Sequence, residues 1–249
     1  MRIVRVHHDN NARYGLADDE TITLISDEPF AAWEREEDMD LGEAILMAPT
    51  MATKIVCVGL NYHAHAAELD MEIPKSPIIF LKPSTSLNGP GAPIHVPEGV
   101  EEIDYEAELA VVVGRRMHRV APDAVPAHIL GFTCANDVTI REYQRTDGQW
   151  TRAKGFDGFC PVGPWVDTDI VPSDVAIETY LNGELRQSAR TSDMIFSVAE
   201  LVSFVSSIMT LLPGDLVLTG TPSGVGPMRK GDVVEVRIEG LGSLVNTVA

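Results

Sequence analysis

The segment YEAELAVVVGRR (Tyr105–Arg116) first alternates between polar and apolar residues and then becomes continuously apolar. This pattern predicts a central strand of a buried sheet. A second run, HILGFTCANDVT (His128–Thr139), predicts another strand, and its polar residues lie at the C-terminal end. We therefore expect strands to form the core of the protein.

Two glutamates lie at the start of the first strand. Glu106 and Glu108 are two residues apart, so the period of a strand places both side chains on one face. Adjacent carboxylates repel each other and resist burial, and a buried pair needs a cation nearby. Asp137 is a third candidate ligand if the two strands are neighbours, and oxygen ligands favour Mg²⁺ or Mn²⁺, and less so Ca²⁺, over zinc. The spacing alone also allows a solvated strand edge with both glutamates facing water.

The remainder of the chain reads mainly as strands. Residues 54–62 and 76–84 are strand-like, and Asn182-Gly183 predicts a tight hairpin because a type I′ turn needs positive φ at both central residues. The clearest helix begins near Ser197, which forms an S-x-x-E capping box with Glu200. Helices are few and no regular βαβ alternation appears, so we expect an α+β or mainly β fold.

The first fifty residues differ from the rest in sequence pattern, with short strand-like runs and an acidic segment. RIVRV (2–6) and TITLI (21–25) predict two short strands joined by a polar turn, and EREEDMD (34–40) reads as a solvated face. We therefore divide the chain into a small β-rich N-terminal domain, residues 1–50, and a main domain, residues 51–249.

Composition narrows the class of protein. The formal charge is −18, from 37 acidic and 19 basic residues, and so strong a negative charge argues against nucleic acid or anionic lipid as a partner. No apolar run reaches the roughly 20 residues of a membrane span, and the N-terminus lacks the apolar stretch of a signal peptide, so we expect a cytoplasmic protein. Three widely spaced cysteines predict buried, reduced thiols.

Several ordered motifs resemble the fumarylacetoacetate hydrolase superfamily over roughly four-fifths of the chain. They are DYEAEL (104–109) with GFTCANDV (131–138), Asn61-Tyr62 with His65 and Glu68, FLKPS (80–84), KGFD (154–157), Asn182-Gly183 and TGTPSGVG (219–226). The resemblance implies a mixed β-sandwich roll, a homodimer, and Mg²⁺ or Mn²⁺ bound by Glu106, Glu108 and Asp137. It also implies that open positions on the metal take the oxygens of a 2-keto acid.

A histidine and a glutamate form the candidate acid–base pair. His65 and Glu68 are three residues apart in a short predicted helix, where Glu68 can accept a hydrogen bond from one imidazole nitrogen and leave the other as a base. An incidental ion pair on a surface helix is the alternative from the residues alone. The resemblance implies the catalytic pair, in a mobile segment over residues 64–75 that covers the metal.

Polar and basic residues near the motifs are candidates for binding a carboxylate or carbonyl group, although each could be an ordinary surface residue. They are Lys82, Arg141, Gln144 and Lys154, and the resemblance adds Tyr143 and Thr221 on the substrate and places Lys154 close to the metal. The glycine-rich segment 219–226 lacks the pattern of a phosphate loop, so we do not expect a nucleotide.

Three reactions share the enolate that such a site would stabilise. Water activated by the His65–Glu68 pair would hydrolyse an acylpyruvate, and loss of a carboxylate as CO₂ would decarboxylate oxaloacetate. Proton transfer alone would isomerise a 2-hydroxyhepta-2,4-diene-1,7-dioate from aromatic catabolism. The presence of both residues favours C–C cleavage of a 2-keto dicarboxylate or acylpyruvate, with the isomerase as the alternative. A catalytically silent relative should have lost a carboxylate or the pair, and this chain has lost neither.

Overall fold

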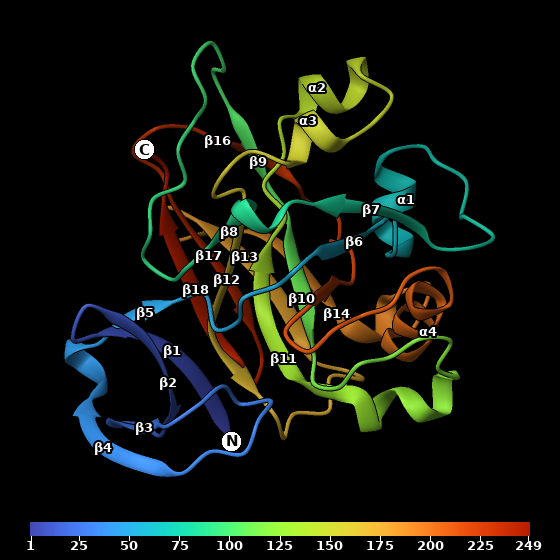
Figure 1. The fold of residues 1–249 in the computed structure, drawn as a ribbon. Coiled ribbons are helices and arrows are strands. Elements are labelled where there is room, and N and C mark those ends of the chain that lie inside the picture. The colour runs from blue at the N-terminus through green and yellow to red at the C-terminus, as the bar shows by residue number, and fades with distance from the viewer.

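The computed structural model describes residues 1–249, and strands are its main elements (Figure 1). The strands are β1 (Arg2–His8), β2 (Asn11–Ala17), β3 (Thr21–Ile25), β4 (Arg35–Asp40), β5 (Ile45–Met47), β6 (Ile55–Gly59), β7 (Ile78–Lys82), β8 (Leu87–Asn88), β9 (Ile103–Tyr105), β10 (Ala107–Val113), β11 (Ile129–Asn136), β12 (Cys160–Asp167), β13 (Ala176–Leu181), β14 (Glu184–Arg190), β15 (Leu216–Leu218), β16 (Gly226–Met228), β17 (Val233–Ile238) and β18 (Gly242–Thr247). The α-helices are α1 (His63–Glu68), α2 (Arg141–Thr146), α3 (Thr151–Lys154) and α4 (Val198–Ile208), and the 3₁₀ helices are Leu41–Glu43, Ser84–Ser86, Pro122–His128 and Thr191–Asp193. The expected α+β class with few helices is confirmed.

The largest sheet contains twelve strands and has β10 near its middle. Its main path runs β4-β3-β2-β1-β12-β11-β10-β15-β6-β7, with β5 beside β1 and β8 beside β12. Most neighbours are antiparallel, but β6 and β15 pair in parallel, so the sheet is mixed. Every residue of β10 is buried, as its apolar run predicts.

This sheet curls around a core of its own. One cluster of buried side chains joins Ile3 of β1, Cys57 of β6 and Val162 of β12, although β6 is four places from β12 along the sheet. Side chains from such distant strands meet only if the sheet is strongly curved, which twisted sheets of many strands allow. The result is the roll that the family resemblance implies.

A second sheet and one helix cover the outer face. The four-stranded sheet has the order β14-β13-β17-β18, and Leu109 of β10 packs against its Ile177 and Val236. Further along β10, Val111 packs instead against Val202 and Val205 of α4. The outer face of the large sheet is therefore covered by strands near the carboxylates and by a helix further away.

Local signals in the sequence are confirmed where they specify short-range geometry. Asn182 and Gly183 have φ of 53° and 82° and connect β13 to β14 as a hairpin. Ser197 is the N-cap of α4, its side chain accepts a hydrogen bond from the Glu200 N–H, and the Glu200 side chain accepts from the Ser197 N–H. The three cysteines are buried and unpaired. None of the helices combines the length and apolar character needed to cross a membrane.

The N-terminal segment contains more strands than its sequence predicted. The segment between RIVRV and TITLI is a strand, β2, rather than only a polar turn, because Asp9 and Asn10 adopt positive φ and reverse the chain directly after β1. The acidic run expected as a plain solvated face forms β4, an exposed edge strand paired with β3. Charged residues on an edge strand discourage pairing with another chain. Because β1 pairs with β12, these strands extend the large sheet, and the division near residue 50 remains a prediction.

Candidate metal centre and its cavity

Three buried carboxylates meet between β10 and β11. Oxygen atoms of Glu106, Glu108 and Asp137 all lie within 4.8 Å of one another, and each residue is at most 5% exposed. The two strands are antiparallel neighbours, with Glu108 opposite Ala135, which brings Asp137 beside the glutamates. The solvated strand edge is therefore not what the chain forms.

The backbone is irregular where this cluster forms. The predicted strand over 105–116 is interrupted at Glu106 and ends at Val113. The Glu106 N–H donates to the side-chain oxygen of Asn136 at 2.9 Å, and the Glu106 carbonyl accepts from the Asp137 N–H at 2.9 Å. These bonds replace regular strand pairing and hold the ends of β9, β10 and β11 together around the carboxylates.

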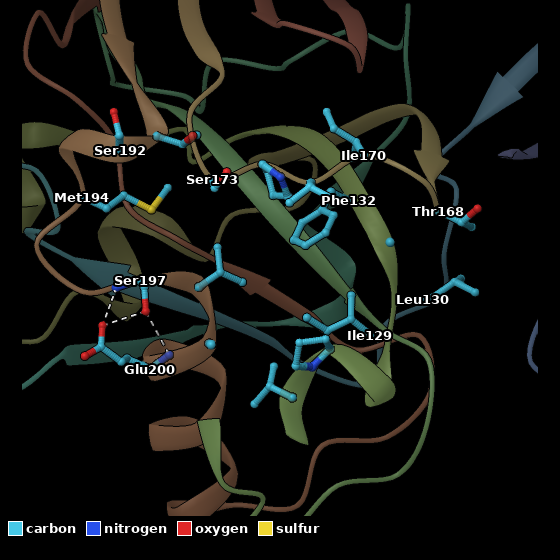
Figure 2. A pocket seen from close by; sticks show the side chains of 18 of the residues that line it. Ile129, Leu130, Phe132, Thr168, Ile170, Ser173, Ser192, Met194, Ser197 and Glu200 are labelled. Atoms are coloured by element: carbon cyan, nitrogen blue, oxygen red, sulfur yellow. Dashed lines mark hydrogen bonds between the residues drawn. The ribbon is translucent and has the colours of Figure 1, made fainter. Parts of the chain in front are cut away.

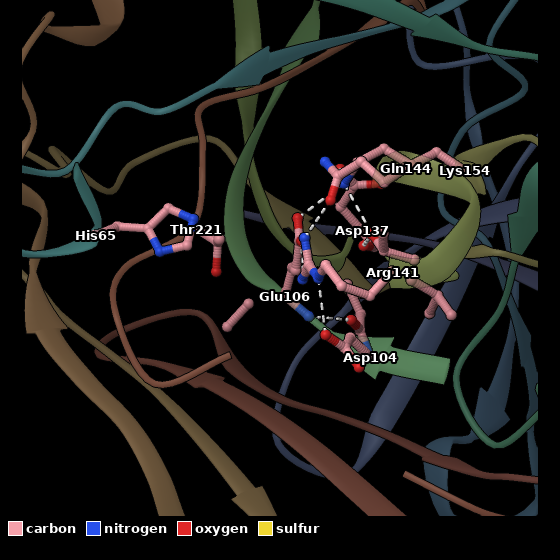
Figure 3. A network of polar contacts seen from close by, with 12 residues as sticks. His65, Asp104, Glu106, Asp137, Arg141, Gln144, Lys154 and Thr221 are labelled. Atoms are coloured by element: carbon pink, nitrogen blue, oxygen red, sulfur yellow. Dashed lines mark hydrogen bonds and ion pairs between the residues drawn. The ribbon is translucent and has the colours of Figure 1, made fainter. Parts of the chain in front are cut away.

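Two cations bind one side of the cluster, as Figure 3 shows. Lys154 Nζ donates to Glu106 at 2.8 Å, to Asp137 at 2.6 Å and to the Thr139 hydroxyl at 2.7 Å. Arg141 donates to Glu106 at 2.7 Å, to Asp104 at 2.9 Å and to the Gln144 side-chain oxygen at 2.5 Å. Lys154 is the last residue of α3 and Arg141 is the first residue of α2, so both short helices place these cations.

The two glutamates differ in electrostatic environment. Burial alone would raise the pKa of Glu106, but the charges of Lys154 and Arg141 and their hydrogen bonds lower that pKa to about 2. Glu108 has no cationic partner and accepts only from the Gly220 N–H, at 2.6 Å. Burial and the negative charges of Asp137 and Glu106 raise the pKa of Glu108 well above its ordinary value. Glu108 is thus the carboxylate whose charge this chain leaves uncompensated.

A hard divalent cation fits this set of donors. A buried carboxylate without a cation is costly, and the oxygen-only cluster lacks the sulfur or imidazole ligands of a typical zinc site. Gly220 allows the close approach to Glu108, because its φ is 93° and a Cβ there would lie 2.7 Å from the Asn61 Cβ. The buried acidic cluster is therefore a candidate metal site.

A cavity of about 300 Å³ opens onto the carboxylates. His65 lines it from α1, and its Nδ1 lies 2.8 Å from Glu68 Oε2, which leaves Nε2 as the free nitrogen. The other oxygen of Glu68 accepts from the Gly224 N–H at 3.0 Å, so one carboxylate ties α1 to the loop after β15. Figure 3 shows His65 and Thr221 on one side of the network, with Arg141, Gln144 and Lys154 on the other.

The residues predicted to bind substrate occupy different places. Thr221, Arg141, Gln144 and Lys154 line the cavity. Lys82 does not line the cavity, because its side chain is fully buried. Its Nζ donates to the Asp137 carboxylate and to the Val138 carbonyl. Tyr143 is also outside the lining, and the guanidinium of Arg152 lies 3.9 Å from its ring centre.

Sequence reasoning did not single out Gln187, which supports the cavity from β14. Its Nε2 donates to the Thr221 hydroxyl at 2.9 Å and to the Pro222 carbonyl at 2.8 Å. Its Oε1 accepts from the Ala107 N–H at 3.0 Å and the Thr179 hydroxyl at 2.6 Å. Gln187 follows the Asn-Gly hairpin, but nothing in the local sequence marks it, because its partners are distant along the chain.

A larger cavity, about 690 Å³, lies elsewhere and differs in chemistry (Figure 2). Its walls are largely apolar and include Ile129, Phe132 and Met194. Its two carboxylates are engaged, Glu200 in the cap of α4 and Asp169 with the N-terminal amine. It offers no free acid or base, so the smaller cavity is the candidate active site.

Comparison with protein families identifies the group to which this fold and site belong. Residues 54–249 match the family model described as fumarylacetoacetate (FAA) hydrolase C-terminal. The chain belongs to the fumarylacetoacetate hydrolase family. Residues 1–49 match a second model, described as Rv2993c-like, N-terminal. The family resemblance seen in the ordered motifs is therefore confirmed, and the protein is an enzyme of this family.

Three individual relatives are similar to this chain over most of its length. Protein Rv2993c of Mycobacterium tuberculosis is 45% identical over 259 residues, covering 100% of this chain and 98% of its own length. The mitochondrial oxaloacetate tautomerase Fahd2a of Rattus norvegicus is 43% identical over 83% of this chain and 70% of its own length. The crystal structure of 2-hydroxyhepta-2,4-diene-1,7-dioate isomerase from Mycobacterium marinum is 43% identical with a TM-score of 0.93, covering 100% of this chain and 98% of that one.

Proposed function

We propose that this protein is a divalent-metal-dependent isomerase that moves a proton on a 2-oxo or 2-hydroxydienoic acid. The observation that carries the proposal is the buried carboxylate cluster facing a histidine whose Nε2 is free, across one small cavity. Two relatives at 43% identity, named a tautomerase and an isomerase, support proton transfer without loss of carbon.

Glu106, Glu108 and Asp137 would hold Mg²⁺ or Mn²⁺. When bound, such an ion polarises the oxygens of a 2-oxo acid and stabilises the charge of its enolate. Lys154 and Arg141 keep Glu106 ionised and oriented through the hydrogen bonds described above. The substrate carboxylate would lie near the Thr221 hydroxyl, whose oxygen already accepts from Gln187 and whose proton is free to donate.

His65 would carry the proton. Glu68 accepts from Nδ1–H and fixes the ring, so Nε2 can take a proton from one carbon of the substrate and return it to another atom. Glu68 also holds α1 against the loop at Gly224, which keeps the imidazole over the cavity. We infer that this contact forms and breaks as residues 64–75 admit the substrate.

C–C cleavage is the second candidate, because the same His65–Glu68 pair could activate water. Acylpyruvate hydrolysis or oxaloacetate decarboxylation would then follow from the same enolate. The two candidates differ in their products, since isomerisation keeps every carbon and cleavage releases pyruvate together with a carboxylic acid or CO₂.

Proton NMR in D₂O separates these reactions directly. We would incubate the protein with 2-hydroxyhepta-2,4-diene-1,7-dioate, oxaloacetate or acetylpyruvate, in Mg²⁺ or in EDTA. The expected result is Mg²⁺-dependent isomerisation or deuterium uptake with all carbons retained. Products of cleavage as the dominant outcome would favour the second candidate, and no metal-dependent conversion of any substrate would contradict both.

Two variants serve as controls for the spontaneous reaction of these compounds with free metal. The reaction rate with Glu108→Gln should fall to the rate measured with Mg²⁺ in the absence of protein. His65→Gln should lower kcat by about 10²–10⁴-fold, the usual contribution of a general acid–base, while metal binding persists. A His65→Gln variant with full activity would show that another group carries the proton.

A further inference from the structure

The cationic side chains of the cavity are almost all committed to this chain's own carboxylates. Three lysine or arginine side chains line the cavity: Arg141, Arg145 and Lys154. Arg141 is shared between Asp104 and Glu106, and Lys154 between Glu106 and Asp137. Both therefore compensate charges of the protein itself.

Arg145 is the exception. Its guanidinium forms no ion pair and no hydrogen bond with the rest of the chain, although the chain carries 37 acidic residues against 19 basic ones. It lies four residues after Arg141 in α2, so both side chains are on the same face of that helix, about 6 Å apart along its axis. Arg145 is exposed and lines the cavity, whereas Arg141 forms ion pairs with the buried Glu106 and Asp104.

Part of the cavity wall is apolar. Ile78 and Phe80 of β7 and Trp150 line the cavity, and Phe80 and Trp150 pack edge to face with ring centres 5.2 Å apart. These side chains suit the hydrocarbon part of a ligand, and the Phe80 ring also faces Lys154 Nζ, which lies 5.0 Å from its centre. The lining of the cavity thus combines the carboxylate cluster, apolar side chains and one unpaired guanidinium.

We propose that Arg145 binds the distal carboxylate of the substrate and so selects an extended dicarboxylate over a monocarboxylate of equal length. The inference rests on the proposed function, in which the 2-oxo acid end of the substrate binds at the carboxylate cluster. A guanidinium matches a carboxylate in two parallel hydrogen bonds, and the apolar side chains of the lining suit the hydrocarbon chain between the two carboxylates. A short dicarboxylate whose second carboxylate stays near the carboxylate cluster would gain nothing from Arg145.

Equilibrium binding tests this without requiring turnover. Isothermal titration calorimetry with Mg²⁺ would compare 2-oxoadipate with 2-oxohexanoate, two six-carbon 2-oxo acids that differ in the distal carboxylate. We expect the wild-type protein to bind 2-oxoadipate at least about tenfold more tightly. Arg145→Gln should remove that preference and leave the affinity for 2-oxohexanoate unchanged, and Arg145→Lys should retain part of it.

Arg116→Gln is the matched control, because it removes the same charge from an exposed arginine that does not line the cavity. It should keep the full preference. Equal affinities for the two ligands in the wild-type protein, no binding of either, or an Arg145→Gln variant that still prefers 2-oxoadipate would each overturn the proposal. A lost preference in Arg145→Gln together with an inactive wild-type protein would contradict the proposed reaction and leave the role of Arg145 supported.

Discussion

The contrast between Glu106 and Glu108 makes a sharp prediction about stability. In metal-free protein, Glu106→Gln should destabilise the fold, whereas Glu108→Gln should leave its stability unchanged or raise it. Glu106 accepts from Lys154 and Arg141, and both cations are largely buried. Glu108 accepts only from the Gly220 N–H, which a glutamine oxygen can also receive.

These contacts set the expected change in the free energy of unfolding for each variant. Removing one member of a buried ion pair lowers the free energy of unfolding by about 3–5 kcal/mol. Lys154 keeps Asp137 and Arg141 keeps Asp104 in the variant, so we expect the lower end for Glu106→Gln, about 3 kcal/mol. In a domain of this size that loss corresponds to a fall in Tm of about 6–12 °C. Glu108→Gln removes repulsion from two neighbouring carboxylates and should change stability by no more than about 1 kcal/mol in either direction.

Added metal should reveal the loss in Glu108→Gln that its stability in EDTA does not show. A ligand present at 100 times its Kd stabilises the folded state by about 2.7 kcal/mol. The wild-type protein should gain that amount from Mg²⁺, and Glu108→Gln should gain almost none because it lacks one of the three ligands.

The assay is urea unfolding followed by circular dichroism, first in EDTA and then over a series of Mg²⁺ concentrations. Equal losses of stability for the two variants in EDTA would refute the reasoning, because the charges of the two glutamates would then be equally compensated. A full Mg²⁺ response in Glu108→Gln would refute its assignment as a ligand.

Three further predictions concern the parts that support the site. Ser197→Ala should lower the free energy of unfolding by about 1 kcal/mol through loss of the α4 cap, measured by urea unfolding, with Mg²⁺ binding unchanged. Gly220→Ala should cost about 1–3 kcal/mol and weaken the Mg²⁺ response, because alanine must adopt a φ of 93° against Asn61, and a normal response would contradict the close approach. Burial raises the thiol pKa of all three cysteines, to about 12 for two of them, so a thiol reagent at pH 8 should react only after unfolding; rapid reaction of the native protein would contradict this burial.

Short-range patterns predicted a good part of the fold. The apolar run of β10, the hairpin at Asn182-Gly183 and the capping box of α4 each depend on a few adjacent residues, and the structure has all three. The interruption at Glu106 was missed because it depends on the Asn136 side chain, thirty residues away. β2 was missed because its pairing depends on a turn at Asp9 and Asn10.

The sequence predicted the carboxylates of the candidate site but not the residues that hold the cavity in place. Spacing brought Glu106 and Glu108 to one face, whereas the contacts of Gln187 with Ala107 and Thr221 join segments 80 and 34 residues apart. No local pattern encodes such contacts. The roles of the site residues, the metal and the homodimer remain predictions from the motifs and their family. The cytoplasmic location remains a prediction from the lack of a long apolar run in the sequence.

The formal charges of the site support the proposal that the substrate is a dicarboxylate. When all groups are counted as ionised, Asp104, Glu106, Glu108 and Asp137 give four negative charges and Lys82, Lys154 and Arg141 three positive ones. One negative charge is then in excess, and the raised pKa of Glu108 reflects the cost of that charge. A divalent cation would turn that excess into one positive charge, which the carboxylate at the head of a 2-oxo acid would neutralise. Arg145 provides one more positive charge in the lining of the cavity, and a second carboxylate would neutralise it. A monocarboxylate would satisfy the metal site and leave the guanidinium without a partner, so the selectivity proposed for Arg145 follows from the same balance of charge that favours a metal on the carboxylate cluster.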